Sequence, residues 1–179
     1  MRTDRVIKLT AATCFVLIIA GVLAAWDSPA TGYEASIYAA THTIFWVALI
    51  FSLVCGVSIV VQQIYTRQHE KSSLWIIGLT LVFLTYIAML SLWIVKGYAM
   101  WCIGDPATHL GITQNVISSG HITTSNLYPI THIYMVQISS VCGIPPIIPH
   151  RYVPLIFGVL FVPFMYLFAK SILPNKGQA

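Results

Sequence analysis

Charge is scarce in this sequence. Only 8% of its 179 residues are charged, with nine Lys and Arg against five Asp and Glu, whereas 58% are hydrophobic. An ordinary soluble domain carries about 25% charged residues. The deficit excludes a water-soluble domain of usual composition. It also argues against nucleic acid as a partner, because nucleic-acid binding needs a dense basic surface.

Familiar catalytic signatures are missing as well. The sequence contains no glycine-rich nucleotide loop, no zinc-protease motif and no serine-hydrolase motif. Its four cysteines lack the paired spacing of a zinc site. Cys14 and Cys55 lie within apolar runs, where a cysteine is usually a small packing residue. Cys102 and Cys142 share one polar segment, so a disulfide between them is left open.

Long uncharged runs dominate what remains. A helix needs about 20 mainly apolar residues to cross a bilayer. Charged residues are absent from four runs near that length, namely 9–25, 43–66, 72–95 and 152–169. We therefore expect an all-α, polytopic membrane protein that forms a single membrane domain over residues 1–179. Its four transmembrane helices are expected at about 6–26, 43–65, 73–97 and 151–172.

The first run has two interpretations. Its basic start, with Arg2, Arg5 and Lys8, is compatible with a cleaved signal peptide. The span is longer than a usual signal core, which favours a retained helix. Three further spans remain in either case.

The basic residues predict the orientation of the chain. Most of them lie before the first span, between the second and third, or after the fourth: Arg2, Arg5, Lys8, Arg67, Lys71, Lys170 and Lys176. The two segments on the opposite side carry only Lys96 and Arg151. Because positive charge marks the cytoplasmic side, we expect a multi-pass protein of the cell membrane with both termini in the cytoplasm.

The outer loop at about 98–150 concentrates the polar residues. The stretch "WCIGDPATHLGITQNVISSGHITTSNLYPITHIY" contains one aspartate, three histidines and no other charge. Asp105 suits a helix N-cap, Pro106 the first turn and Gly120 the exit, which predicts a helix over about 106–119. A second helix is expected from Pro129 to just before Gly143. Both are apolar with few charges, so we expect them to lie on the membrane surface.

Asp105 and His109 are the candidate catalytic residues of this loop. They are four residues apart and share a helix face with Ile112 and Val116. Aspartate and histidine exchange protons and also bind divalent metals, so a metal ion at Asp105 and His109 is one hypothesis. The simpler alternative is that Asp105 only caps its helix. His121 and His132 have weaker claims as ligands, although the fold can bring them close.

The motifs "GDPATHLG", "SSGHI", "NLYPITHI" and "VPLIFGVLFVPFMYLFAKSIL" are similar to the opening part of GT-C superfamily membrane glycosyltransferases. The segment "SPATGYEASIYAATHTIFW" looks like a leader of archaeal members, and the resemblance covers residues 27–172. It implies transfer of a sugar from a polyprenyl-phosphate carrier at the outer face. Asp105 matches the acidic residue of the first outer loop, acting as a base or through a metal, with His109 beside it. Tyr128 and His132 would then contact substrate.

Two departures from that family keep the enzyme assignment open. Many members have a second acidic residue beside the first, where this chain has Ala107, Thr108 and His109. Such enzymes also have many more spans, so a four-span chain is expected to be incomplete for catalysis. The alternative is a non-enzymatic membrane subunit or remnant that docks a partner subunit through its outer loop. A small-solute transporter ranks third, because no buried charge is expected in the spans.

Overall fold

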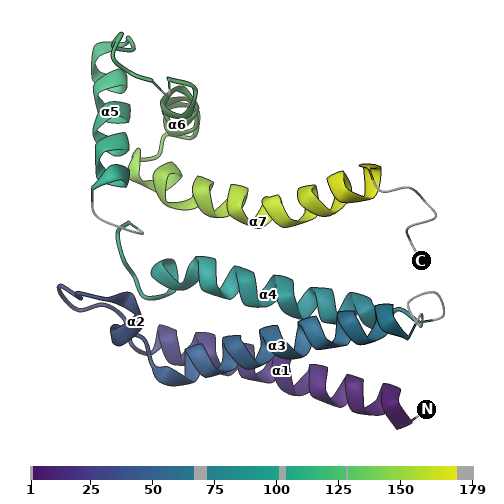
Figure 1. The fold of residues 1–179 in the computed structure, drawn as a ribbon. Helices are drawn as coiled ribbons and strands as arrows, with labels where there is room; N and C mark the ends of the chain where they lie inside the picture. The colour runs from purple at the N-terminus through teal and green to yellow at the C-terminus, as the bar shows by residue number, and fades with distance from the viewer. Residues whose placement is uncertain (1, 67–71, 101–103, 128, 173–179) are drawn as a thin grey trace. The chain divides into compact units, whose positions relative to one another are not determined.

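The structure is a computed structural model that describes residues 2–66, 72–100, 104–127 and 129–172. Every regular element in these ranges is a helix, as Figure 1 shows. The helices are α1 (Arg2–Trp26), α2 (Ile37–Ala40), α3 (Thr43–Tyr65), α4 (Leu74–Val95), α5 (Asp105–Ser119), α6 (Pro129–Cys142) and α7 (Ile147–Ile172). The expected all-α fold is confirmed. The short α2 in the first loop was not expected.

Four helices are long and apolar enough to cross a membrane, as expected. They contain the segments Asp4–Trp26, Thr43–Tyr65, Leu74–Val95 and Ile147–Ala169. The last of these helices starts at Ile147 and not at the expected residue 151. Pro149 falls in its first turn, where backbone N–H groups have no partner within the helix, so a proline is tolerated there. The four spans make this a multi-pass membrane protein.

The chain divides into two compact units, which are described separately. The bundle unit comprises Met1–Gly97 and Val159–Ala179, and the loop unit comprises Tyr98–Gly158. A single membrane domain over the whole chain stays a prediction.

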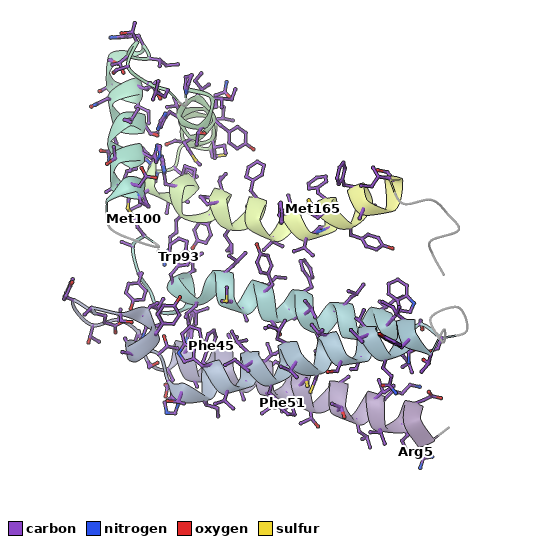
Figure 2. All side chains as sticks on the ribbon, viewed as in Figure 1. Arg5, Phe45, Phe51, Trp93, Met100 and Met165 are labelled. Atoms are coloured by element: carbon purple, nitrogen blue, oxygen red, sulfur yellow. The ribbon has the colours of Figure 1, made fainter. Side chains whose placement is uncertain are left out.

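The core of the bundle unit lies where α1, α3 and α4 pack against one another (Figure 1). Each helix buries one narrow stripe and leaves large apolar side chains on its other faces. Phe45 of α3 is buried, for example, whereas Phe51 of the same helix is exposed (Figure 2). In water so much exposed apolar surface would drive association. In a bilayer the lipid chains cover it, which is the usual arrangement of a membrane helix bundle.

Lys96 is the C-cap of α4 and lies within the expected span 73–97, and it overturns the expectation that no span carries a buried charge. Its side chain is only 1% exposed. The ammonium donates to Ser28 O at 2.9 Å and Ala40 O at 2.7 Å, and it lies 3.6 Å from Glu34 Oε1. The Lys96 carbonyl accepts from Ala30 N–H at 2.8 Å. The first loop therefore replaces water around this charge, and Lys96 ties that loop to the end of α4.

In the loop unit, α5 and α6 pack against each other, and Figure 1 shows α6 end-on beside α5. Helix α5 ends at Gly120, whose φ of 72° is the left-handed exit that the sequence predicts. Its start differs from expectation by one residue. Gly104, at φ 102°, is the N-cap, and Asp105 is the first helical residue, so the Asp105 side chain is not the cap. A glycine adopts this positive φ without strain. The position of α5 and α6 on the membrane surface stays a prediction.

Candidate functional site

Two histidines meet between α5 and α6. His109 Nδ1 lies 2.8 Å from His132 Nε2, and the ring centroids are 5.0 Å apart. His132 has no exposed surface, whereas the His109 side chain is 29% exposed. Helical spacing explains their placement, because each residue lies on the face of its helix that packs against the other. The pair is thus a buried polar contact with one accessible end.

Asp105 stands at that accessible end. Its Oδ1 lies 3.4 Å from His109 Nε2, and its side chain is 81% exposed. The four-residue spacing that the sequence showed brings the two side chains together, as expected. Asp105 is also in the first turn of α5, where an acidic side chain interacts favourably with the helix dipole. The solvent-accessible carboxylate of Asp105 is therefore in contact with the imidazole ring of His109.

Asn126 approaches the opposite end of the pair from the loop between the helices. Its Nδ2 lies 2.9 Å from His132 Nδ1. Both ring nitrogens of His132 are therefore engaged, one by the amide and the other by His109. Asn126, His132, His109 and Asp105 form a continuous row, which we call the polar row.

A second contact joins α5 to the first turn of α7, within the loop unit. The buried Thr113 hydroxyl lies 3.0 Å from His109 O and 2.8 Å from His150 Nε2. A hydroxyl has one proton to donate. If Thr113 donates it to His109 O, its oxygen accepts from a proton on His150 Nε2. This contact anchors the α5 turn from which His109 projects.

The structure brings Asp105 and His109 together, as expected, and it places His132 beside His109, a proximity that the sequence left open. The expected substrate-binding residue Tyr128 lies outside the described residues. His132 was also expected to bind substrate. That role stays a prediction, and the structure shows the His132 ring fully buried. His121 is exposed, and its Nδ1 lies 3.1 Å from the carbonyl oxygen of Ser119, the last residue of α5.

Sequence reasoning missed Asn126, Thr113 and His150. Thr113 had a usable signal, because it follows His109 by four residues and therefore shares its helix face. Asn126 and His150 had none, since their contacts depend on how the loop and the first turn of α7 fold back.

The residues offer few ligands for a metal. Within the described ranges, no three His, Cys, Asp or Glu side chains gather so that they could hold a metal ion. Asp105 and His109 supply two donors, and a divalent ion there would need phosphate oxygens or water to complete its coordination. The metal stays a prediction.

The loop unit contains one acidic side chain and one Lys or Arg side chain. Between residues 98 and 158 the sequence holds Asp105 as its single acidic residue and Arg151 as its single Lys or Arg. Arg151 is half-buried in the first turns of α7, and its Cζ lies 5.8 Å from the centre of the Tyr152 ring. Guanidinium groups are well suited to phosphate, which they contact with paired donors.

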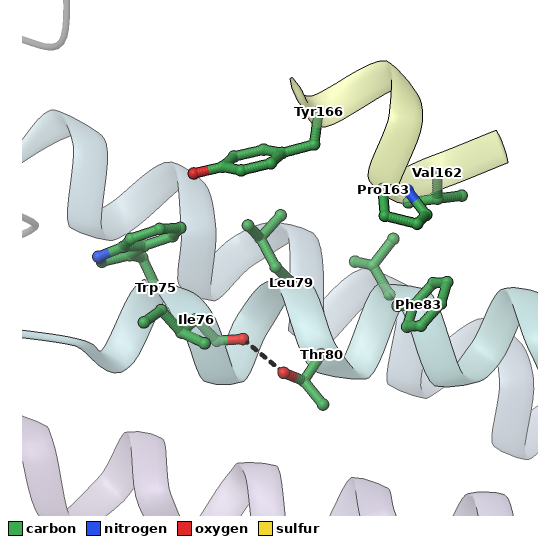
Figure 3. A pocket seen from close by; sticks show the side chains of 9 residues that line it. Trp75, Ile76, Leu79, Thr80, Phe83, Val162, Pro163 and Tyr166 are labelled. Carbon is green, nitrogen blue, oxygen red and sulfur yellow. Dashed lines mark hydrogen bonds between the residues drawn. The ribbon is translucent and has the colours of Figure 1, made fainter. Parts of the chain in front are cut away.

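The bundle unit contains a groove of a different character. Its volume is about 420 Å³, and Figure 3 shows apolar side chains of α4 and α7 around it, including Trp75, Phe83 and Tyr166. Thr80, a polar lining residue, donates its hydroxyl proton to Ile76 O at 2.8 Å. No lining side chain is an acid or a base of the kind that transfers protons near neutral pH. The groove suits a hydrocarbon chain, and the ionisable chemistry lies in the loop unit.

Comparisons with protein-family models, curated proteins and solved structures find no match for this chain. A functional assignment therefore has to come from the residues and their contacts.

Proposed function

We propose that the loop unit is the acceptor-side site of a GT-C-like glycosyltransferase, which takes its sugar from a polyprenyl-phosphate carrier at the outer face of the cell membrane. Both termini would then be cytoplasmic. The observation that carries the proposal is Asp105, a carboxylate that is 81% exposed and has His109 Nε2 at 3.4 Å behind it. A general base needs both features, because it must reach the substrate and be held in one orientation.

The proposed reaction is a substitution at the sugar. The acceptor oxygen forms a bond to the anomeric carbon, and the bond from that carbon to the phosphate oxygen breaks. Polyprenyl phosphate leaves with the bonding electron pair, and the acceptor proton passes to Asp105. His109 contacts Oδ1 of the carboxylate. Oδ2 is then the oxygen that receives the proton.

The leaving phosphate needs a positive partner. Arg151 is the residue of the loop unit with that charge, and we assign it to the phosphate. A divalent ion at Asp105 and His109 is an alternative arrangement, because it would need His109 Nε2 without its proton; it would supply further positive charge to the phosphate.

The test is the Asp105→Asn substitution in the native gene, with sugar transfer measured in native membranes. Loss of a general base lowers the rate by about 10²–10⁴-fold. The matched control is Asp27→Asn, which removes an exposed carboxylate from the first loop and should leave transfer unchanged. Normal transfer by Asp105→Asn, at a normal amount of protein in the membrane, contradicts the proposal.

A second function, docking of a membrane partner, is favoured by the outer face of α6. Ile130, Tyr134 and Val141 recur at helical spacing, and all three are exposed. Ile112 and Val116, which share the face of Asp105, are half-buried. A charge at Val141 therefore probes the outer face, whereas one at Val116 would disturb the helix pair. Loss of a co-purifying subunit from Val141→Lys, with Asp105→Asn silent, would favour this function over transfer.

A further inference from the structure

The polar row has a direction when both imidazole rings are neutral, and the contacts at its two ends agree on that direction. At the inner end, the Asn126 amide nitrogen can only donate a hydrogen bond. It lies 2.9 Å from His132 Nδ1, which must therefore accept and carry no proton. A neutral imidazole has one N–H. His132 then carries its proton on Nε2.

The same step repeats at the next ring. His132 Nε2–H donates to His109 Nδ1, 2.8 Å away, so that Nδ1 carries no proton. The proton of His109 is consequently on Nε2, the nitrogen that lies 3.4 Å from Asp105 Oδ1.

For a neutral His109, the contact at the outer end agrees with this direction. If the Asn126 amide were turned over, its oxygen would accept from His132 Nδ1–H, and His109 would donate through Nδ1. A neutral His109 would then present an unprotonated Nε2 lone pair to the Asp105 carboxylate, which is electrostatically unfavourable. Amide orientation and tautomer are interdependent assignments, and here the amide at one end and the carboxylate at the other agree.

We infer that Asn126 and His132 are positioning residues: they hold His109 in the tautomer with its proton on Nε2, and His109 in turn orients Asp105. This inference deepens the proposed function and rests on it for its role in transfer. Neither residue touches the reacting atoms. The direction has a consequence for the chemistry, because His109 Nε2 already carries a proton. The row orients Asp105 and does not conduct its proton inward, so the proton that Asp105 takes from the acceptor leaves through the exposed side of the carboxylate.

The test reads the protonation of each ring nitrogen directly, by nitrogen NMR of the whole chain in lipid bilayers with ¹⁵N-labelled histidine. Signals are assigned by the losses in His109→Gln and His132→Gln. We expect each neutral ring to carry its proton on Nε2 and none on Nδ1. Asn126→Asp replaces the donor by an acceptor and should put a proton on His132 Nδ1. Ser125→Asp adds the same charge at an exposed neighbour and should leave the pattern unchanged.

Two results would overturn the inference. One is a protonated His132 Nδ1 in the unmodified chain, and the other is an unprotonated His132 Nδ1 in Asn126→Asp. The transfer assay adds a separate arm, in which Asn126→Asp should lower kcat by about 10²-fold, as misplacement of a catalytic group does, with little change in KM. If Asp105→Asn abolishes transfer and Asn126→Asp does not, the positioning role fails and the proposed function stands. If Asp105→Asn transfers normally, the proposed function fails, and the NMR result still decides the tautomers.

Discussion

Gly56 of α3 and Gly78 of α4 face each other with no room for a side chain on either. A Cβ on Gly56 would lie 2.9 Å from Gly78 O, and a Cβ on Gly78 would lie 2.8 Å from Gly56 O. Membrane helices gain little from hydrophobic burial against one another, because lipid is as apolar as leucine. Close backbone approach at small residues therefore sets the strength of the α3–α4 contact.

Gly56→Ala should weaken that contact. The new methyl group meets backbone and not the end of a flexible side chain, so the helices must separate. Overpacking of this kind costs about 1–3 kcal/mol, measured as the free energy of unfolding in detergent micelles. Gly32→Ala is the control, because a Cβ there meets no heavy atom within 4 Å. Equal stability of the two variants would mean that the crossing is looser than described.

Lys96→Met should detach the first loop from the end of α4. The substitution keeps an unbranched side chain but removes the ammonium that contacts Ser28 O, Ala40 O and Glu34. Buried hydrogen bonds to a charged group contribute about 1.5–3 kcal/mol each, and their loss is not additive. We expect faster hydrogen exchange in residues 28–40 and a less stable bundle. Lys8→Met removes an exposed charge from α1 and should do neither.

His132→Ala should loosen the α5–α6 pair and leave the three-helix core intact. The ring is fully buried and bonds to both Asn126 and His109, so its removal leaves a cavity and polar atoms without their partner. The expected cost is about 2–4 kcal/mol, confined to the loop unit and visible as lost hydrogen-exchange protection in α6. His121→Ala, at an exposed histidine, is the matched control. Uniform loss of protection across α1, α3 and α4 would show instead that the two units unfold together.

Hydrophobicity was enough to predict the spans, because each helix must satisfy its own backbone in lipid and so shows in the sequence as an uncharged run. The predicted bounds 43–65 are those of α3. Local spacing was also enough for Asp105 and His109, which share a helix face. Local spacing could not predict the contact of Asn126 with His132 or that of His150 with Thr113. Both contacts depend on how the chain reverses between helices.

The burial of Lys96 could not be predicted from the sequence. The sequence places it at the end of an apolar run, where a lysine usually extends toward water. Its burial depends on carbonyl groups of Ser28 and Ala40, about 60 residues away in the chain, and backbone carbonyls leave no mark in a sequence. The topology prediction counts Lys and Arg residues on each side of the membrane. Such a count does not distinguish a solvated lysine from a buried lysine that bonds to a loop.

Topology can be tested with the exposed thiol Cys142 in the loop unit. With the other three cysteines replaced by serine, Cys142 should react with a membrane-impermeant maleimide added to intact cells. Gly32→Cys, in the first loop, should behave likewise in a chain without Cys142. Thr66→Cys, at the exposed C-cap of α3, should react only after the cells are opened, because α3 must cross the bilayer between residues 32 and 66. Reaction of Thr66→Cys in intact cells, with protection of Cys142, would reverse the orientation. The polar row would then face the cytoplasm, and a lipid-phosphate donor at the outer face could not reach it.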